Sequence, residues 1–220
     1  MSIQILTIKD KNYPELLKKI YDPPSKLYVS GELKKEEKYP LAIVGTRRIS
    51  NYGQQTTRLF AEALAEAGIT IISGLALGVD GLAHRIALEK KARTIAVLGS
   101  GLNIIYPSAH QKLAQEILVS GGAIISEYSP NTSPTKKTFP ARNRIVSGLS
   151  LGVLVIEAPR KSGALITART AIEQGREVFV VPGRINDLNS EGCNYLIKMG
   201  ARLVTNPEEI IEVITELPKP

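Results

Sequence analysis

From residue 41 onward, short apolar segments alternate with amphipathic stretches along the chain. The apolar segments predict buried strands at residues 41–44, 69–72, 94–98, 123–125, 152–156, 178–181 and 202–204. Between the first two, residues 52–67 place Leu59, Ala63, Leu64 and Ala67 on one face of a predicted helix. Fully apolar strands that alternate with helices are typical of a parallel sheet covered on both faces. The pattern therefore predicts an α/β fold with a doubly wound, mostly parallel sheet.

The first 38 residues have a different pattern from the rest of the chain. Residues 13–21 suit one short helix that ends at Pro23-Pro24, and residues 27–29 suit a short strand. The charged run at residues 34–40 ends in proline and is typical of a linker. We therefore expect a short N-terminal helical and strand stub with its linker at residues 1–38, followed by a main domain at residues 39–220.

Polar and small residues follow most of the predicted strands. In a doubly wound sheet, ligands bind outside the carboxyl ends of the strands. Those positions hold residues 45–48, 73–78, 99–103, 126–127, 157–163 and 182–184, and glycine occurs in all of them except 126–127. Glycine lets backbone amides approach a ligand closely. Cations and backbone amides without a paired nucleophile and base suit phosphate binding, which favours a nucleic-acid or nucleotide binder.

Two groups of cations stand out near these turns. Arg47 follows the first strand, where a guanidinium beside free amides can hold a phosphate; the alternative is an ion pair with Asp80 or Glu157. Residues 136–144 carry four cations around Phe139, a mixture that contacts the backbone and bases of single strands. The alternatives here are a solvated basic loop and a phenylalanine that anchors the core.

Composition narrows the classes of protein and location. Apolar residues make up 43% of the 220 and charged residues 22%, which is ordinary for a soluble globular protein, and the net charge of +7 suits a polyanionic partner. Aromatic residues are only 5% without tryptophan, which disfavours an extended base-stacking platform. The one cysteine forms no disulfide framework. Because no apolar signal region or membrane span is evident, we expect a cytoplasmic protein.

The motifs of several catalytic and cofactor sites are missing from the sequence. There is no phosphate-binding P-loop motif, and the turn that begins at Gly99 lacks the third glycine of a dinucleotide fingerprint. His84 and His110 have no ligand at metal-binding spacing, and Ser73 lacks the flanking glycines of a nucleophile elbow. We therefore expect no catalytic residue, no metal and no cofactor.

Eight segments, in order and over nearly the whole chain, resemble the DprA/Smf family, the DNA-processing proteins of natural transformation. They are YPELLKKIYDPPSKLYVSG (13–31), AIVGTRRISNYG (42–53), SGLALGVDGLAH (73–84), AVLGSGLNIIYP (96–107), SEYSP (126–130), FPARNRIVSGLS (139–150), SGALITARTAIEQGREVFVVPG (162–183) and GCNYLIKMGARLV (192–204). The resemblance implies an extended Rossmann-like fold at residues 39–220 that binds single-stranded DNA in a basic pocket. It also implies a homodimer that protects incoming strands and loads the recombinase RecA, without enzymatic activity.

The resemblance also implies roles for individual residues. Arg47 would hold a phosphate, the turn from Gly99 to Gly101 would donate amides, and Lys136 and Phe139 would flank the strand. The remaining residues that it implicates are Arg142 and Arg144 as neighbours of the strand, and Asn194, Ile197 and Leu203 in the dimer interface. Many family members carry further N-terminal or C-terminal domains without a counterpart in these segments, and functions of those domains are left open.

Two other functions compete with this interpretation. One is a nucleoside-monophosphate-processing enzyme of the related lysine-decarboxylase-like fold, whose signature motif contains a catalytic glutamate. The corresponding residues 162–169 read SGALITAR and contain no glutamate. The other is a small-ligand sensor, which would bind a free nucleotide tightly.

Overall fold

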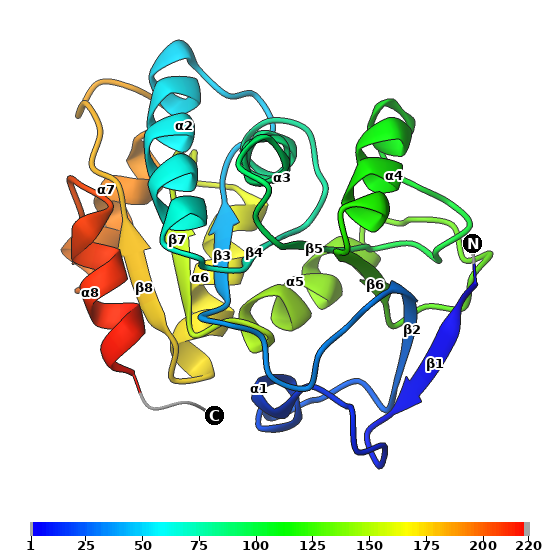
Figure 1. The fold of residues 1–220 in the computed structure, drawn as a ribbon. Helices are drawn as coiled ribbons and strands as arrows, with labels where there is room; N and C mark the ends of the chain where they lie inside the picture. The colour runs from blue at the N-terminus through cyan, green and yellow to red at the C-terminus, as the bar shows by residue number, and fades with distance from the viewer. Residues whose placement is uncertain (1, 218–220) are drawn as a thin grey trace.

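The computed structural model describes residues 2–217, in which nine strands form one sheet at the centre (Figure 1). The strand order is β1-β2-β6-β5-β4-β3-β7-β8-β9. The strands are Gln4–Thr7 (β1), Lys26–Gly31 (β2), Leu41–Val44 (β3), Ile71–Ser73 (β4), Thr94–Val97 (β5), Ala123–Ser126 (β6), Gly152–Val155 (β7), Glu177–Val180 (β8) and Arg202–Leu203 (β9). From β6 to β9 in this order, each strand pairs in parallel with its neighbours. At the other edge, β2 pairs antiparallel with both β6 and β1. The predicted mostly parallel α/β sheet is confirmed.

Helices connect the parallel strands and cover both faces of the sheet. They are Glu15–Lys18 (α1), Asn51–Glu66 (α2), Val79–Glu89 (α3), Gln111–Val119 (α4), Thr138–Gly148 (α5), Gly163–Glu173 (α6), Glu191–Lys198 (α7) and Glu208–Glu216 (α8). Buried side chains of α2, α3 and α8 pack on one face of the sheet, and α4 covers the same face beside them. Buried side chains of α1, α5, α6 and α7 pack on the opposite face. None of the helices within residues 2–217 is long and apolar enough to cross a membrane.

The chain reverses its direction of travel across the sheet at β3. It first runs outward through β3, β4, β5 and β6, then crosses back through α5 to β7 on the other side of β3. The carboxyl ends of β3 and β7 therefore lead to loops on opposite faces of the sheet. Such a switch point opens a crevice between the two loops, where open α/β sheets bind their ligands.

One predicted helical face needs correction. Ser50 caps α2 by accepting a hydrogen bond from the Gly53 amide at 3.0 Å. The buried face of this helix contains Phe60 and Leu64, whereas Leu59 is 55% exposed. The expectation that Leu59 lies on the buried face was therefore wrong, because the larger Phe60 next to it occupies the core and turns Leu59 outward.

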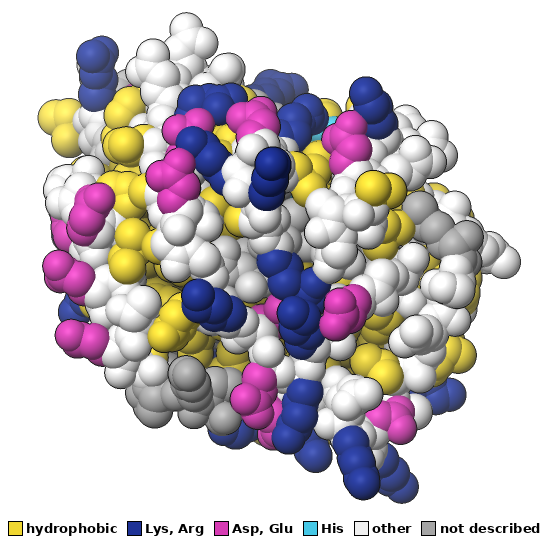
Figure 2. All heavy atoms as spheres, viewed as in Figure 1, with side chains coloured by type: hydrophobic (Ala, Val, Ile, Leu, Met, Phe, Trp, Pro, Cys, Tyr) yellow, Lys and Arg dark blue, Asp and Glu magenta, His cyan; other side chains and the backbone are white. Residues whose placement is uncertain are grey.

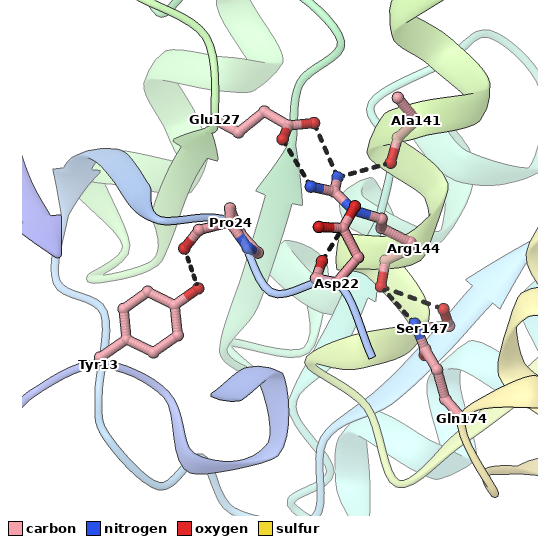
Figure 3. Close-up of polar contacts among 8 residues, drawn as sticks. All are labelled: Tyr13, Asp22, Pro24, Glu127, Ala141, Arg144, Ser147 and Gln174. Atoms are coloured by element: carbon pink, nitrogen blue, oxygen red, sulfur yellow. Dashed lines mark hydrogen bonds and ion pairs between the residues drawn. The ribbon is translucent and has the colours of Figure 1, made fainter. Parts of the chain in front are cut away.

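The N-terminal segment joins the same sheet. Strand β2 pairs with β6, and β1 pairs with β2, so residues 4–31 extend the sheet at one edge. Helix α1 spans only four residues of the predicted 13–21, and the predicted strand at 27–29 is part of β2. Tyr13 is buried, and its hydroxyl donates a 2.7 Å hydrogen bond to the Pro24 carbonyl (Figure 3).

We expect Tyr13→Phe to lower the free energy of unfolding by about 0.5–2 kcal/mol, because the Pro24 carbonyl loses its partner in a buried setting. Tyr21 is fully exposed, so Tyr21→Phe is the matched control and should leave stability unchanged. Urea denaturation of both variants measures the difference. Equal stability of the two variants would show that the Tyr13 hydroxyl does not stabilise this segment.

Candidate functional site

A cleft of about 700 Å³ lies at the switch point between β3 and β7. The loops after β3, β4 and β7 line it, together with α5 and the first turn of α6. We call this the switch-point cleft; its lining residues are 44–48, 74, 76, 80, 106, 136, 139, 140, 142, 143, 146, 159, 161–164, 166 and 167. It therefore brings together Arg47, Lys136, Phe139 and Arg142, which are separated by up to 95 residues in the sequence.

Arg47 is exposed in this cleft, and its guanidinium carbon lies 5.2 Å from the centre of the Phe139 ring. Among residues 2–217 no ion pair joins Arg47 to a carboxylate. Glu157 instead accepts hydrogen bonds from the amide and hydroxyl of Ser50. The alternative in which Arg47 pairs with Asp80 or Glu157 is therefore not observed, and the Arg47 guanidinium is available to an anion.

Phe139 is half-buried at the start of α5, where it also packs against Tyr106 with ring centres 5.6 Å apart. A Cβ at Gly99 would lie 2.9 Å from the Phe139 ring, so the absence of a side chain at this position lets the ring pack. The Gly101 amide donates to the Thr132 carbonyl at 2.8 Å. Neither glycine lines the switch-point cleft, so the structure does not bring this turn to the cleft as a source of amides.

Arg142 forms the buried floor of the cleft and is only 4% exposed. Its Nη1 donates to the carbonyls of Gly74 and Val97, which lie at the ends of β4 and β5. Burial lowers the pKa of Arg142 to about 10, an effect that nearby Asp80 opposes. Burial raises the pKa of Asp80, and the charge of Arg142 opposes that shift. Arg142 thus remains cationic at neutral pH and contributes positive potential beneath the cleft.

The first turn of α6 closes the other side of the cleft. Ser162 caps this helix by accepting from the Leu165 amide at 3.4 Å, and Asn143 donates to the Gly163 carbonyl at 3.1 Å. The amides at a helix N-terminus favour an anion, and the exposed Lys161 adds a full charge. Lys161 and Arg48 also line the cleft. The sequence placed both in the loops that follow β7 and β3, but did not single them out as site residues.

Arg144 is not among the residues that line the cleft. Figure 3 shows its guanidinium beside the carboxylate of Glu127 and next to Asp22. Its guanidinium makes two 2.8 Å contacts with the carboxylate of Glu127, and its Nε lies 3.1 Å from the carboxylate of Asp22. Burial alone would lower the pKa of Arg144, but these two carboxylates outweigh it and raise the pKa. Arg144, which we expected beside the DNA strand, therefore lies in an ion-pair network. This network joins α5 to the end of β6 and to the N-terminal segment.

The three residues of the expected dimer interface differ in their surroundings. The Asn194 amide group bonds both the amide and the carbonyl of Gly183, at 3.2 and 3.0 Å. Ile197 is partly buried against the core beneath α7. Leu203 is 43% exposed on β9, which is the last strand of the sheet and has no neighbour on its outer side among residues 2–217. Leu203 is thus the most accessible of the three.

The sequence matches the family model for DNA recombination-mediator protein A over residues 4–215. The chain belongs to the DprA/Smf family. It is 54% identical to protein Smf of Escherichia coli over 91% of this chain, and 42% identical to DprA of Bacillus subtilis over 97%. The chain spans 54% of the length of the E. coli relative and 72% of that of the B. subtilis relative.

Solved DprA structures share the fold. The structure of Streptococcus pneumoniae DprA superimposes with a TM-score of 0.89 at 41% identity, covering 99% of this chain and 75% of that one. The structure of Helicobacter pylori DprA superimposes with a TM-score of 0.86 at 38% identity, covering 98% of this chain and 96% of that one. That structure was solved to show how the H. pylori protein binds single-stranded DNA. A molybdenum cofactor binding protein from Rippkaea orientalis shares the fold alone, at 18% identity and a TM-score of 0.57.

We expect Arg144→Met to lower the free energy of unfolding by about 1–3 kcal/mol, because Glu127 is left mostly buried without a partner. Arg58→Met is the matched control, since Arg58 pairs with Glu62 and Glu89 on an exposed helical surface. The control should lose about 0.5 kcal/mol or less. Urea denaturation compares the two, and an equal loss would contradict a special role for the Arg144 network.

Proposed function

We propose that this chain binds single-stranded DNA in the switch-point cleft and, as a homodimer, protects the strand and loads the recombinase RecA. The observation that carries the proposal is the Arg47–Phe139 pair, which sets a phosphate-binding guanidinium 5.2 Å from a ring on which a base can stack. The proposed cytoplasmic location follows from the recombinase partner. All of the lining residues fall within the proposed DNA-binding domain, residues 39–220.

The balance of charge in the cleft supports a polyanionic ligand. The lining residues include the five cations Arg47, Arg48, Lys136, Arg142 and Lys161, against one carboxylate, Asp80. In contrast, basic and acidic side chains are interspersed over the face of the molecule seen in Figure 2. The excess of positive charge in the cleft attracts phosphates at low salt and releases counterions when a strand binds.

The same residues favour binding over hydrolysis of nucleoside monophosphates. Asp80 is buried, accepts a hydrogen bond from the Ala76 amide at 3.4 Å, and lies near the cationic Arg142. A buried carboxylate beside Arg142 partly neutralises the charge of that guanidinium, and it is not exposed as a catalytic acid or base would be. We therefore propose a mediator without a catalytic step, and a hydrolysis assay on nucleoside monophosphates beside the binding assay tests this.

Arg47→Gln should weaken binding of a labelled oligo-dT about 3- to 10-fold, because one phosphate contact is lost. The slope of log K against log[salt] should become shallower by about 0.7. Fluorescence anisotropy at several salt concentrations measures both quantities. Lys112→Gln removes one exposed charge from α4 and serves as the control that should bind as wild type. A variant at Arg47 that binds normally would refute the cleft as the DNA site.

Leu203→Glu should convert the proposed dimer into a monomer, because a two-fold contact would bring two added charges together in an apolar interface. Leu203 is preferred over Ile197 for this test because Ile197 also packs against the core. Light scattering measures the mass, and Ile185→Glu, at a residue that is 95% exposed, is the control. A Leu203→Glu protein that stays dimeric would place the interface elsewhere.

A further inference from the structure

A small side pocket of about 50 Å³ adjoins the switch-point cleft where the segments that follow β4 and β5 meet. It shares six lining residues with the cleft, among them Arg47, Tyr106 and Phe139, and adds Leu77 and Pro107. We call it the Leu77–Tyr106 pocket. In the sheet, β4 and β5 lie on the opposite side of β3 from β8 and β9, so the pocket is remote from the proposed dimer surface on α7 and β9.

Tyr106 extends the aromatic surface that Phe139 begins. The two ring centres are 5.6 Å apart with an angle of 46° between the ring planes, and Tyr106 is 48% exposed. The Phe139 ring also lies 5.2 Å from the guanidinium carbon of Arg47. Phe139 therefore contacts both a cation and a second ring, and bases of any sequence stack on such aromatic surfaces.

Leu77 supplies an apolar wall of the pocket and is 47% exposed. Its loop is anchored on both sides, because His110 donates from Nδ1 to the Leu75 carbonyl at 2.9 Å and the Val79 amide donates to the Thr46 carbonyl at 3.2 Å. Leu75 and Val79 are fully buried, so the loop between them presents Leu77 outward. The exposure of Leu77 thus follows from an anchored loop, and it leaves an apolar surface that the fold itself does not cover.

The lining of the pocket suits a base that is attached to a phosphate. The described lining residues include the cations Arg47 and Arg142 and no carboxylate, and the remaining side chains are aromatic or apolar. A free anion would leave the apolar walls uncovered, whereas a base covers them. The volume of the pocket, compared with about 700 Å³ for the cleft, suits one base and excludes a longer stretch of strand.

We propose that the Leu77–Tyr106 pocket receives one base of the bound strand, which stacks on Tyr106 while Arg47 holds a neighbouring phosphate. The inference rests on the proposed function of the cleft and names the residues that bind a base there. It places part of the strand on the β4–β5 side of Arg47. Because stacking neutralises no phosphate, Tyr106 and Leu77 contribute to affinity without contributing to its salt dependence.

Tyr106→Ala should weaken binding of a labelled oligo-dT of about six nucleotides roughly 5- to 20-fold, and Leu77→Ala roughly 2- to 5-fold. Fluorescence anisotropy at several salt concentrations should give the wild-type slope of log K against log[salt] for both variants. Leu77→Ala leaves the Tyr106–Phe139 ring pair in place. The matched controls are Tyr21→Ala and Leu59→Ala, whose side chains are exposed outside both cavities and which should bind as wild type.

A scan with abasic nucleotides shows whether Tyr106 contacts a base. Each abasic substitution removes one base and keeps its phosphate, and so short a strand cannot shift its register without losing phosphate contacts. In the wild type, removal of the base that enters the pocket should weaken binding by about the same factor as Tyr106→Ala. Combined with Tyr106→Ala, the same abasic nucleotide should cause no further loss.

Wild-type affinity of Tyr106→Ala or of Leu77→Ala would overturn the inference. Additive losses at every abasic position would also overturn it, as would a shallower salt slope, which would show that the substitution displaces Arg47. Arg47→Gln separates this inference from the proposed function. If Arg47→Gln weakens binding while both pocket variants bind normally, only the base pocket is wrong; if Arg47→Gln itself binds normally, the cleft is wrong as the DNA site.

Discussion

The cleft depends on the hydrogen bonds that the buried guanidinium of Arg142 donates. This guanidinium joins α5 to the carbonyls of Gly74 and Val97 and so fixes the crossover helix beneath the strand ends. Two residues further along, Arg144 joins the same helix to Glu127 and Asp22 on its other side. Because α5 begins at Thr138, these two attachments also fix where Phe139 lies. The cleft is therefore formed by a helix that is held at both sides.

The strands beyond residue 41 could be predicted to within one or two residues. Buried parallel strands are continuous apolar runs, and glycines or polar residues end them abruptly, so the local sequence determines their position. The N-terminal edge was harder to predict. Strand β1 carries partly or fully exposed residues and is stabilised by pairing with β2, which local sequence does not reveal. For the same reason helix α1 is shorter than predicted, since propensity alone does not set where tertiary contacts end a helix.

The candidate site shows the same limit at the level of single residues. The carboxyl ends of parallel strands all lie at the same edge of the sheet, so the residues that follow the strands could be assigned to that edge from the sequence. Arg47 lies at this edge, in the cleft. The direction of each α5 side chain depends on the helix itself. Arg142 and Arg144 differ by two positions, which is a rotation of about 200° at 3.6 residues per turn, so they face opposite sides. The composition of the segment made them look equivalent, whereas only one of them lines the cleft.

The placement of Asp80 explains how the proposed site for a polyanion can include a carboxylate. A buried arginine without a counter-charge would be costly, and Asp80 offsets part of that cost from a position that is itself buried. Partial neutralisation keeps the pKa of Arg142 near 10, so the guanidinium stays charged throughout the physiological range. The surplus positive charge at the proposed site then resides on the exposed side chains of Arg47, Arg48, Lys136 and Lys161. Exposed cations are screened by salt, so we expect the affinity of the proposed site for a polyanion to fall as ionic strength rises.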